Sequence, residues 1–339
     1  MFDPAAATST RFGVELVASL DAVKKAARLC EAVQQRLVAG TTLEKGDKSP
    51  VTVADFGAQA IVSHLLSREF PHIPLIGEED ASALREPSGE ILRQKVFAAV
   101  HGVLPDLTED EILDAIDRGT HPGGPTGAHF TLDPIDGTKG FLRQQQYAVA
   151  LALVVDGDVE IGVLGCPNLP VADADPDRGR GVLAWGIRGE GARISPLAST
   201  DVHPLFVDDV SDPSAARFCE SVESGHSDQS TSAAIARRLG ITAEPYRIDS
   251  QCKYVAVARG DASIYLRLPV RADYVEKVWD HAAGMRVITE AGGRVTDVDG
   301  KPLDFSRGRR LEDNRGVIVT NGTLHEPVLA AVARELPSA

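Results

Sequence analysis

The sequence predicts a mixed α/β protein made of two halves. Apolar residues recur at three- and four-residue steps in the first seventy positions, which is the spacing of helices that bury one face. After position 181, helix-type and strand-type patterns alternate, which favours a second α/β arrangement. The 339 residues are more than one small core requires. Because the polar stretch 173–181 lies between these parts, we expect an α+β half at 1–172 and an α/β half at 173–339.

The N-terminal half is expected to begin with two long helices and to end in a β-hairpin. Gly40 and Pro71 are the expected stops of the two helices. The hairpin turns at Asp156-Gly157-Asp158, a sequence typical of tight turns. The polar segment 81–128 is interpreted as an insertion, or a lid over a cleft. The expected helices are 11–37, 54–70, 90–100 and 109–118, and the expected strands are 73–76, 130–132, 147–156 and 158–166.

The C-terminal half is expected to alternate strands and helices along its whole length. Its segments are short, and glycine or polar residues separate them. A layered α/β half follows from that alternation. The segments are 218–222, 230–239, 246–249, 254–259, 263–268, 279–291, 294–296, 316–320 and 327–336.

The charge balance limits the classes of partner. Lys and Arg number 35 against 49 for Asp and Glu, which gives a net charge of −14. Such a field repels nucleic acid and anionic membranes, so we expect neither as a partner and expect a monomer. A small anionic substrate remains compatible if local cations or metals reverse the field in one cleft. The short basic run 307–310 is interpreted as a solvated loop rather than a nucleic-acid patch.

The cysteines and the N-terminus bear on the compartment. The four cysteines are scattered, with no CxxC pair and no histidine at zinc-ligand spacing, and are interpreted as reduced, mostly buried thiols. No apolar stretch approaches the ~20 residues of a membrane helix, and the first residues lack the pattern of a secretory signal. We therefore expect a cytoplasmic protein, and an organelle stays open if a targeting peptide precedes this numbering.

Acidic residues at the ends of predicted elements carry the main chemical signal. Asp133 and Asp136 lie three positions apart, in a turn shaped by a proline and a glycine, so both carboxylates can face one point beyond a strand. Asp55, Glu78 and Asp280 lie at the ends of other elements. Buried carboxylates are costly without a cation, and oxygen ligands favour Mg²⁺ over zinc. Two or three Mg²⁺ that share Asp133 would suit in-line attack of water on phosphorus.

Each of these motifs also has a purely structural explanation. An Asp-x-x-Asp sequence is commonly a turn or a helix cap, the run Glu78–Asp80 can be a solvated loop, and Asp280 can cap the following helix. Lys253 and Arg267 can be surface charges, and His226 can be a structural histidine. The motifs gain specificity only when they are taken together.

The combined motifs resemble the inositol monophosphatase superfamily of lithium-sensitive, Mg²⁺-dependent phosphatases. The resemblance extends from about Val14 to Asn321, and its closer branch is that of the 3′(2′),5′-bisphosphate nucleotidases. It implies an α/β/α/β/α layered sandwich. The superfamily blocks are Ser49–Asp55, Ile76–Glu79, Asp133–Thr138 and Trp279–Gly284. The blocks of the nucleotidase branch are Lys48–Thr52, Leu132–Leu142, Gly165–Leu169, Ser221–His226 and Asp249–Tyr254.

The resemblance implies roles for the matching residues. Two to three Mg²⁺ ions are expected, and Asp55 is expected to act with Thr138 on the attacking water. The implied metal ligands are Glu78, Asp133, Asp136, Asp280 and the backbone carbonyl of Ile135. The implied nucleotide contacts are Thr138, His226, Ser250, Lys253 and Arg267. If the segment 138–146 begins as a helix, its first N–H groups suit phosphate oxygens.

The implied activity is hydrolysis of the 3′-phosphate of adenosine 3′,5′-bisphosphate, which gives AMP and phosphate and would serve sulfur assimilation. 3′-Phosphoadenosine 5′-phosphosulfate is a second expected substrate. Two alternatives stay open: an inositol polyphosphate 1-phosphatase or inositol monophosphatase on the same scaffold, and a nucleotide-binding sensor without catalysis. Because all the implied ligands and Thr138 are present, the sequence favours the enzyme over the sensor.

Overall fold

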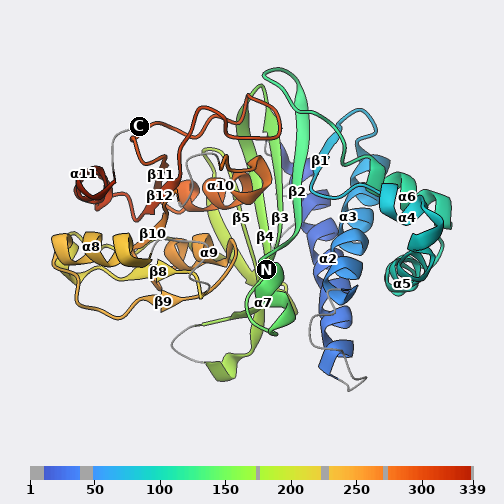
Figure 1. Cartoon of the computed structure of the whole chain (residues 1–339), viewed down its shortest axis with the longest axis horizontal. Helices are drawn as coiled ribbons and strands as arrows, with labels where there is room; N and C mark the ends of the chain where they lie inside the picture. The colour runs from blue at the N-terminus through green and yellow to red at the C-terminus, as the bar shows by residue number, and fades with distance from the viewer. Residues whose placement is uncertain (1–10, 39–48, 173–175, 223–228, 270–273, 337–339) are drawn as a thin grey trace.

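The computed structural model describes residues 11–38, 49–172, 176–222, 229–269 and 274–336, which form two β-sheets and the helices around them (Figure 1). The larger sheet has seven strands in chain order, β1 to β7. β1 runs parallel to β2, and each later pair of neighbours is antiparallel. The strands are β1 (Leu75–Gly77), β2 (Ala128–Asp136), β3 (Ala148–Val155), β4 (Asp158–Pro170), β5 (Arg180–Ile187), β6 (Gly191–Pro196) and β7 (His203–Leu205).

The smaller sheet has five strands in the order β11-β12-β10-β8-β9. β8 is parallel to both of its neighbours, whereas β12 is antiparallel to β10 and β11. The sheet is therefore mixed. Its strands are β8 (Phe218–Glu220), β9 (Tyr246–Arg247), β10 (Ile264–Arg267), β11 (Arg294–Thr296) and β12 (Val317–Thr320).

Helices separate and cover the two sheets (Figure 1). α2 and α3 pack on one face of the larger sheet, α9 and α10 lie between the sheets, and α8 and α11 cover the smaller sheet. The five-layer sandwich expected from the resemblance is confirmed. These helices are α2 (Gly13–Val38), α3 (Ser49–Glu69), α8 (Gln229–Leu239), α9 (Cys252–Ala258), α10 (Ala282–Glu290) and α11 (His325–Glu335). The shorter helical elements are α4 (Ser82–Arg85), η1 (Pro87–Gly89), α5 (Glu90–His101), α6 (Glu109–Asp117), α7 (Thr138–Leu142), η2 (Pro176–Arg178), η3 (Pro213–Ala215) and η5 (Val278–Asp280).

The pattern of strand β3 shows why the layers form. Successive side chains of a strand point to opposite faces, so Leu151 packs with α2 and α3 while Ala150 and Ala152 pack with α9 and α10. The small side chains on the second face allow α10 to approach closely. A Cβ atom at Gly162, in β4, would lie 2.4 Å from the carbonyl oxygen of Ala283. The sheet therefore carries α10 at short distance.

Some predicted boundaries were wrong. The helix predicted from position 54 begins at Ser49. The segment 138–146 does begin as a helix, α7, which ends at Leu142. The strand predicted to end at Asp133 continues to Asp136, because a register shift between these residues lets the strand pass its proline. The segment 279–291 divides into η5 and α10. These differences arise where turns and tertiary pairing override the local pattern.

The segment 81–128 lies beside α3 rather than between the sheets (Figure 1). Its helices α5 and α6 coincide closely with the predicted helices 90–100 and 109–118, and both pack against α3. A capping box at Thr108 and Glu111 starts α6. No residue of 81–128 lines the cavity described below, so these contacts give no support to the expected lid.

The two expected halves do not coincide with the two sheets. β5, β6 and β7 lie after position 172, yet they pair in order onto β4 and complete the larger sheet. The division at 172/173 therefore stays a prediction about folding units. In the structure the larger sheet ends with Leu205, and all strands of the smaller sheet follow it in the chain. All four cysteines are buried, as expected, and their thiols are free. Within the described ranges, none of the helices combines the length and apolarity that a membrane crossing requires.

Candidate functional site

A cavity of about 410 Å³ opens where the ends of β1 and β2 meet α7, α9, β10 and η5. Its walls hold nine of the eleven residues that the sequence predicts for the site. They are Glu78, Asp133, Ile135, Asp136, Thr138, Ser250, Lys253, Arg267 and Asp280. Asp55 lies behind this set, and His226 lies outside the described residues. Segments far apart in the chain thus meet at one cavity, while the role of each residue stays a prediction.

The irregular end of β2 supplies two of the carboxylates. The Asp133 side chain is buried, and its Oδ1 atom has no hydrogen-bond partner. Asp136 Oδ2 accepts a hydrogen bond from the backbone N–H of Gln251 at 2.5 Å. A buried carboxylate oxygen without a partner is costly unless a cation satisfies it. Asp133 therefore fits a metal ligand better than a structural turn residue.

The carboxylates raise one another's pKa values. Burial, followed by the charge of Glu78, raises the pKa of Asp133 well above its ordinary range. Burial and the charge of Asp136 raise the pKa of Glu78. The pKa of Asp280 rises to about 8, because burial and the charge of Asp136 outweigh the nearby guanidinium of Arg267. A set of oxygen donors that repel one another when ionised fits a hard divalent cation.

A second cluster of possible ligands has a different explanation. Glu276, Asp280 and His281 offer atoms within 4.8 Å of one another, the tightest such group in the described chain. Glu276 is occupied, because its Oε2 accepts from Arg267 Nε at 2.8 Å and lies 3.2 Å from His281 Nε2. His281 Nδ1 lies 2.8 Å from the Tyr254 hydroxyl. We therefore interpret Glu276 and His281 as members of an internal hydrogen-bond network at the wall of the cavity, and Asp280 as a member of the acidic set above.

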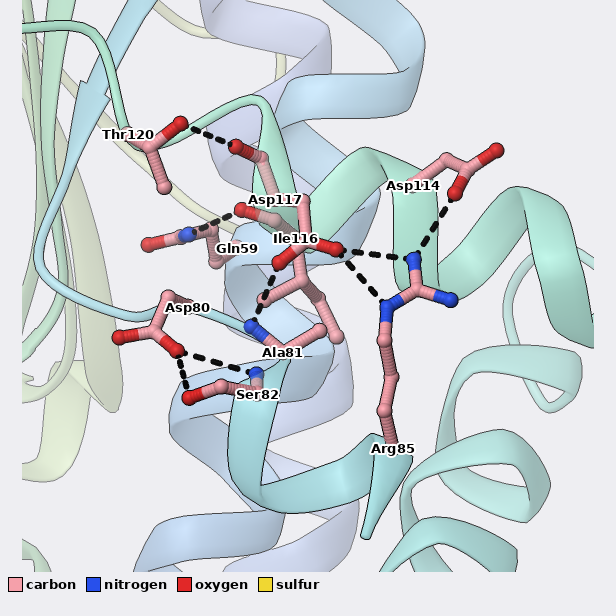
Figure 2. Close-up of polar contacts among 9 residues, drawn as sticks. All are labelled: Gln59, Asp80, Ala81, Ser82, Arg85, Asp114, Ile116, Asp117 and Thr120. Atoms are coloured by element: carbon pink, nitrogen blue, oxygen red, sulfur yellow. Dashed lines mark hydrogen bonds and ion pairs between the residues drawn. The ribbon is translucent and has the colours of Figure 1, made fainter.

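The loop that follows β1 is held from two helices, and Figure 2 shows its bond to Asp117 of α6 and the bond that joins Gln59 of α3 to Ile116 of α6. This loop carries Glu78 and Glu79. Gln59 Nε2, from α3, donates to the carbonyl oxygen of Glu79 at 2.6 Å and to a carbonyl at the end of α6 at 2.8 Å. Asp117 Oδ1, from α6, accepts from the N–H of Ala81 at 2.8 Å. The position of Glu78 is thus set by α3 and by the segment 81–128.

Two glycines make room for the amide of Gln59. A Cβ atom at Gly77 would lie 2.4 Å from Gln59 Oε1, and one at Gly119 would lie 2.4 Å from Gln59 Nε2. Neither glycine has a positive φ, so close packing rather than backbone freedom requires them here. The loop that bears Glu78 is therefore closely packed on its inner side.

Asp55 and Thr138, the two residues expected to act on the attacking water, lie on different helices, and only Thr138 lines the cavity. Asp55 is buried in α3, and burial and the charges of Glu79 and Glu78 raise its pKa well above the ordinary value. Thr138 is exposed at the first turn of α7 and lines the cavity. No hydrogen bond joins the Asp55 carboxylate to the Thr138 hydroxyl within the described chain. The expected relay between them therefore stays a prediction.

Two cations, Lys253 and Arg267, line the same cavity as the carboxylates, and Arg267 NH2 lies 3.8 Å from Asp280 Oδ2. Lys253 is 4% exposed and makes no ion pair with a described residue, and its ammonium lies 5.1 Å from the centre of the Tyr265 ring. Burial lowers the pKa of Lys253, although the charge of Asp136 opposes that effect. Ser250 lines the same wall with a left-handed φ of 67°. A buried ammonium with no ion pair among the described residues suits an anionic ligand.

Sequence reasoning missed several residues that build the site. Gln251 donates its backbone N–H to Asp136, and its side chain bonds the Trp279 carbonyl at 2.9 Å and the Gly284 N–H at 3.0 Å. It therefore ties the end of β2 to η5 and α10. Glu276 fixes the guanidinium that faces the cavity, as described above. Neither has a sequence signal of its own, although both lie inside or beside quoted blocks.

The five-layer fold and the carboxylate-lined cavity define a layered α/β protein whose site suits divalent cations beside an anionic ligand. The chain belongs to the inositol monophosphatase family, whose sequence model matches residues 14–337. The chain is 46% identical, over 341 aligned positions, to a 3′(2′),5′-bisphosphate nucleotidase of Emericella nidulans, with 93% of this chain and 96% of that one covered. It is 44% identical to a protein of the same name from Oryza sativa, with 96% and 95% covered.

Solved structures show the same fold at lower identity. An inositol monophosphatase from Anabaena (Nostoc) sp. PCC 7120 superposes with a TM-score of 0.60 at 20% identity, covering 97% of this chain and 98% of that one. SuhB of Mycobacterium tuberculosis gives a TM-score of 0.60 at 19% identity, with 94% and 95% covered. The fold class and the family membership predicted from the sequence blocks are confirmed.

Proposed function

We propose that this chain hydrolyses the 3′-phosphate of adenosine 3′,5′-bisphosphate, which gives AMP and phosphate. The relatives that share more than two fifths of its sequence over nearly their whole length are named 3′(2′),5′-bisphosphate nucleotidases. The observation that carries the proposal is one cavity that holds buried carboxylates together with the ammonium of Lys253, which is buried and makes no ion pair with a described residue. A metabolite with two phosphates can satisfy both walls at once.

Metal binding is assigned to the acidic wall. Glu78, Asp133, Asp136 and Asp280, with the carbonyl of Ile135, would hold two to three Mg²⁺ ions. The orphaned Oδ1 of Asp133 and the raised pKa values of its neighbours support that assignment. When bound, the ions supply positive charge that offsets these carboxylates and the charge of the phosphoryl group that is transferred.

The side chains around the acidic wall orient the reactants. The Thr138 hydroxyl would hold the attacking water by a hydrogen bond and take its proton, while Asp55 would accept the proton of that hydroxyl. The raised pKa of Asp55 favours such proton acceptance. Lys253 and Arg267 would bind the second phosphate, and Ser250 would contribute a hydroxyl beside them. His226 remains an expected nucleotide contact.

A substrate panel with phosphate detection tests the proposal. Adenosine 3′,5′-bisphosphate, 3′-phosphoadenosine 5′-phosphosulfate, inositol 1,4-bisphosphate and inositol 1-phosphate are compared in Mg²⁺, with and without Li⁺. We expect the adenosine compounds to have the highest kcat/KM and Li⁺ to inhibit. Preference for an inositol phosphate would refute the substrate assignment, and tight nucleotide binding in calorimetry without phosphate release would support a sensor.

The Lys253→Met variant tests the second phosphate site. Methionine keeps the shape of the side chain and removes the buried charge, so the fold should tolerate it. Loss of a charge-assisted contact of roughly 1.5–3 kcal/mol predicts a KM for the bisphosphate that is about 10- to 100-fold higher. A phosphomonoester without a second phosphate should be almost unaffected. Equal effects on both substrates would contradict the assignment of Lys253.

A further inference from the structure

One arginine of the basic run 307–310 is not solvated. Arg309 is half-buried, and its guanidinium lies 4.8 Å from the centre of the Trp279 ring. Its NH1 nitrogen donates to the carbonyl oxygens of Gly119 at 2.9 Å and His121 at 3.1 Å, and its NH2 nitrogen donates to that of Gly77 at 2.5 Å. The expectation of a solvated loop was therefore wrong at this position, while Arg307 and Arg310 are exposed as expected.

The loop that carries Arg309 is fixed by its backbone. Val278 donates its N–H to the Arg309 carbonyl at 3.2 Å, and Leu311 donates its N–H to the Glu276 carbonyl at 2.9 Å. These bonds place the loop alongside the chain that leads to Asp280. The guanidinium position is thus a consequence of two flanking backbone contacts rather than of a flexible side chain on a free loop.

The same loop also touches the segment before β2. Gly308 has a φ of +95°, and a Cβ atom at this position would lie 2.8 Å from the carbonyl oxygen of Pro122. A Cβ atom at Gly123 would lie 2.8 Å from the Cα atom of Gly308. These two glycines therefore let the loop pack closely against the segment before β2. At this short distance the Arg309 side chain can reach the end of β1.

Two of the four partners of Arg309 are immediate neighbours of proposed metal ligands. Gly77 precedes Glu78, at the end of β1, and Trp279 precedes Asp280, in η5. Arg309 is 232 positions from Gly77 along the chain. Only a tertiary contact of this kind can fix the distance between the end of β1 and η5. One guanidinium contacts both, by a hydrogen bond to the Gly77 carbonyl and by a cation–π contact with the Trp279 ring.

We propose that Arg309 is a positioning residue that holds Glu78 and Asp280 at the separation the metal site requires. The inference rests on the proposed function, because it takes both residues as metal ligands. Residues that orient ligands from outside commonly change metal affinity when they are replaced. Arg309 contacts neither a reacting atom nor the cavity wall, so its effect would pass through the two neighbouring ligands.

Arginine is the side chain that this position needs. Three carbonyl oxygens from two segments accept from one rigid fork, and its central carbon lies 4.8 Å from the centre of the indole ring. A lysine ammonium is a point charge on a flexible stem, so it cannot donate to all three oxygens while stacking on Trp279. Lysine should therefore replace the charge but not the positioning.

The test compares Arg309→Met, Arg309→Lys and the control Arg310→Met in metal-stripped enzyme. Mg²⁺ binding is measured by calorimetry, and backbone hydrogen exchange is measured without metal. We expect Arg309→Met to weaken the tightest Mg²⁺ site about 10- to 100-fold, and Arg309→Lys to behave nearly as Arg309→Met does. Exchange should rise over residues 76–80 and 278–282. Arg310→Met removes the same charge from an exposed side chain and should change neither readout.

Each outcome separates this inference from the proposed function. Mg²⁺ affinity within twofold of the wild type in both Arg309 variants would overturn the positioning role, even if either variant were less stable. If the wild type itself bound no Mg²⁺, the proposed metal site would fail. Hydrogen exchange alone would then decide whether Arg309 positions the two segments. A local rise over both segments in the Arg309 variants would support that role, and unchanged exchange would overturn it.

Discussion

Replacing Glu276 with glutamine is expected to lower the free energy of unfolding by about 3 kcal/mol at pH 7. Glu276 is 5% exposed and accepts from Arg267 Nε at 2.8 Å, and it also contacts His281. Glutamine keeps the shape but not the charge, so the guanidinium would remain largely buried without its main counter-ion. The network at the cavity wall would then hold an uncompensated cation.

The magnitude follows from the pKa of the carboxyl group. Burial alone would raise the pKa of Glu276, but the hydrogen bond from His281 and the charge of Arg267 lower it from 4.5 to about 2. At about 1.4 kcal/mol for each pH unit, this difference corresponds to about 3 kcal/mol. Because the folded-state pKa is depressed, the stabilisation is present above pH 4.5 and is lost as the pH falls towards 2.

Urea unfolding in EDTA between pH 8 and pH 3 measures both effects. The difference between wild type and Glu276→Gln should be constant above about pH 5 and should shrink below it. Glu326→Gln is the matched control, because Glu326 pairs with Arg294 at 2.7 Å but is 70% exposed, so its loss should cost at most about 1 kcal/mol. A difference for Glu276→Gln below about 1 kcal/mol, or one that does not change with pH, would refute the reasoning.

Three further outcomes are expected. Gly284→Ala should lower the free energy of unfolding by about 1–3 kcal/mol in urea, because its Cβ would lie 2.3 Å from Cδ2 of Tyr254, whereas Gly102→Ala, whose nearest contact is 3.2 Å, should be nearly neutral. Gln59→Leu should cost about 2–4 kcal/mol in the same assay and weaken Mg²⁺ binding, because it leaves both backbone groups of Glu79 unpaired. Chelation should lower the melting temperature, and Mg²⁺ at a hundred times its Kd should restore about 2.7 kcal/mol of stability; a melting temperature that is indifferent to metal would contradict the acidic wall as a cation site.

Local pattern predicted most of the secondary structure in this chain. The helical spacing of the first seventy residues and the Asp156-Gly157-Asp158 turn act over a few positions, so their elements appear where they were expected. The end of β2 was predicted too early, because pairing with β3 carries the strand beyond Asp133 and across a proline. The pairing of β5 to β7 with the earlier strands depends on contacts that no local pattern encodes.

The candidate site was predictable where chemistry is concentrated in short blocks. Buried carboxylates need a cation, so the acidic motifs predicted a cation site. The structure places these motifs around one cavity. Gln251, Glu276 and Arg309 act through hydrogen bonds to other site residues or to backbone carbonyls far along the chain. Their residue types are common on protein surfaces, so only the folded arrangement distinguishes Arg309 from the exposed Arg310 beside it.

The alanines of β3 and the glycine of β4 that admit α10 have a consequence for engineering. Asp280 lies just before this helix in the chain. The distance between α10 and the larger sheet therefore also sets the position of the Asp280 carboxylate. Enlarging Ala150 or Gly162 to fill the interior would lift the helix by a fraction of an ångström. Such a variant would remain folded, but the carboxylate oxygens of Asp280 would be displaced. Attempts to stabilise this enzyme by substitution should therefore begin on the face of the larger sheet that packs against α2 and α3.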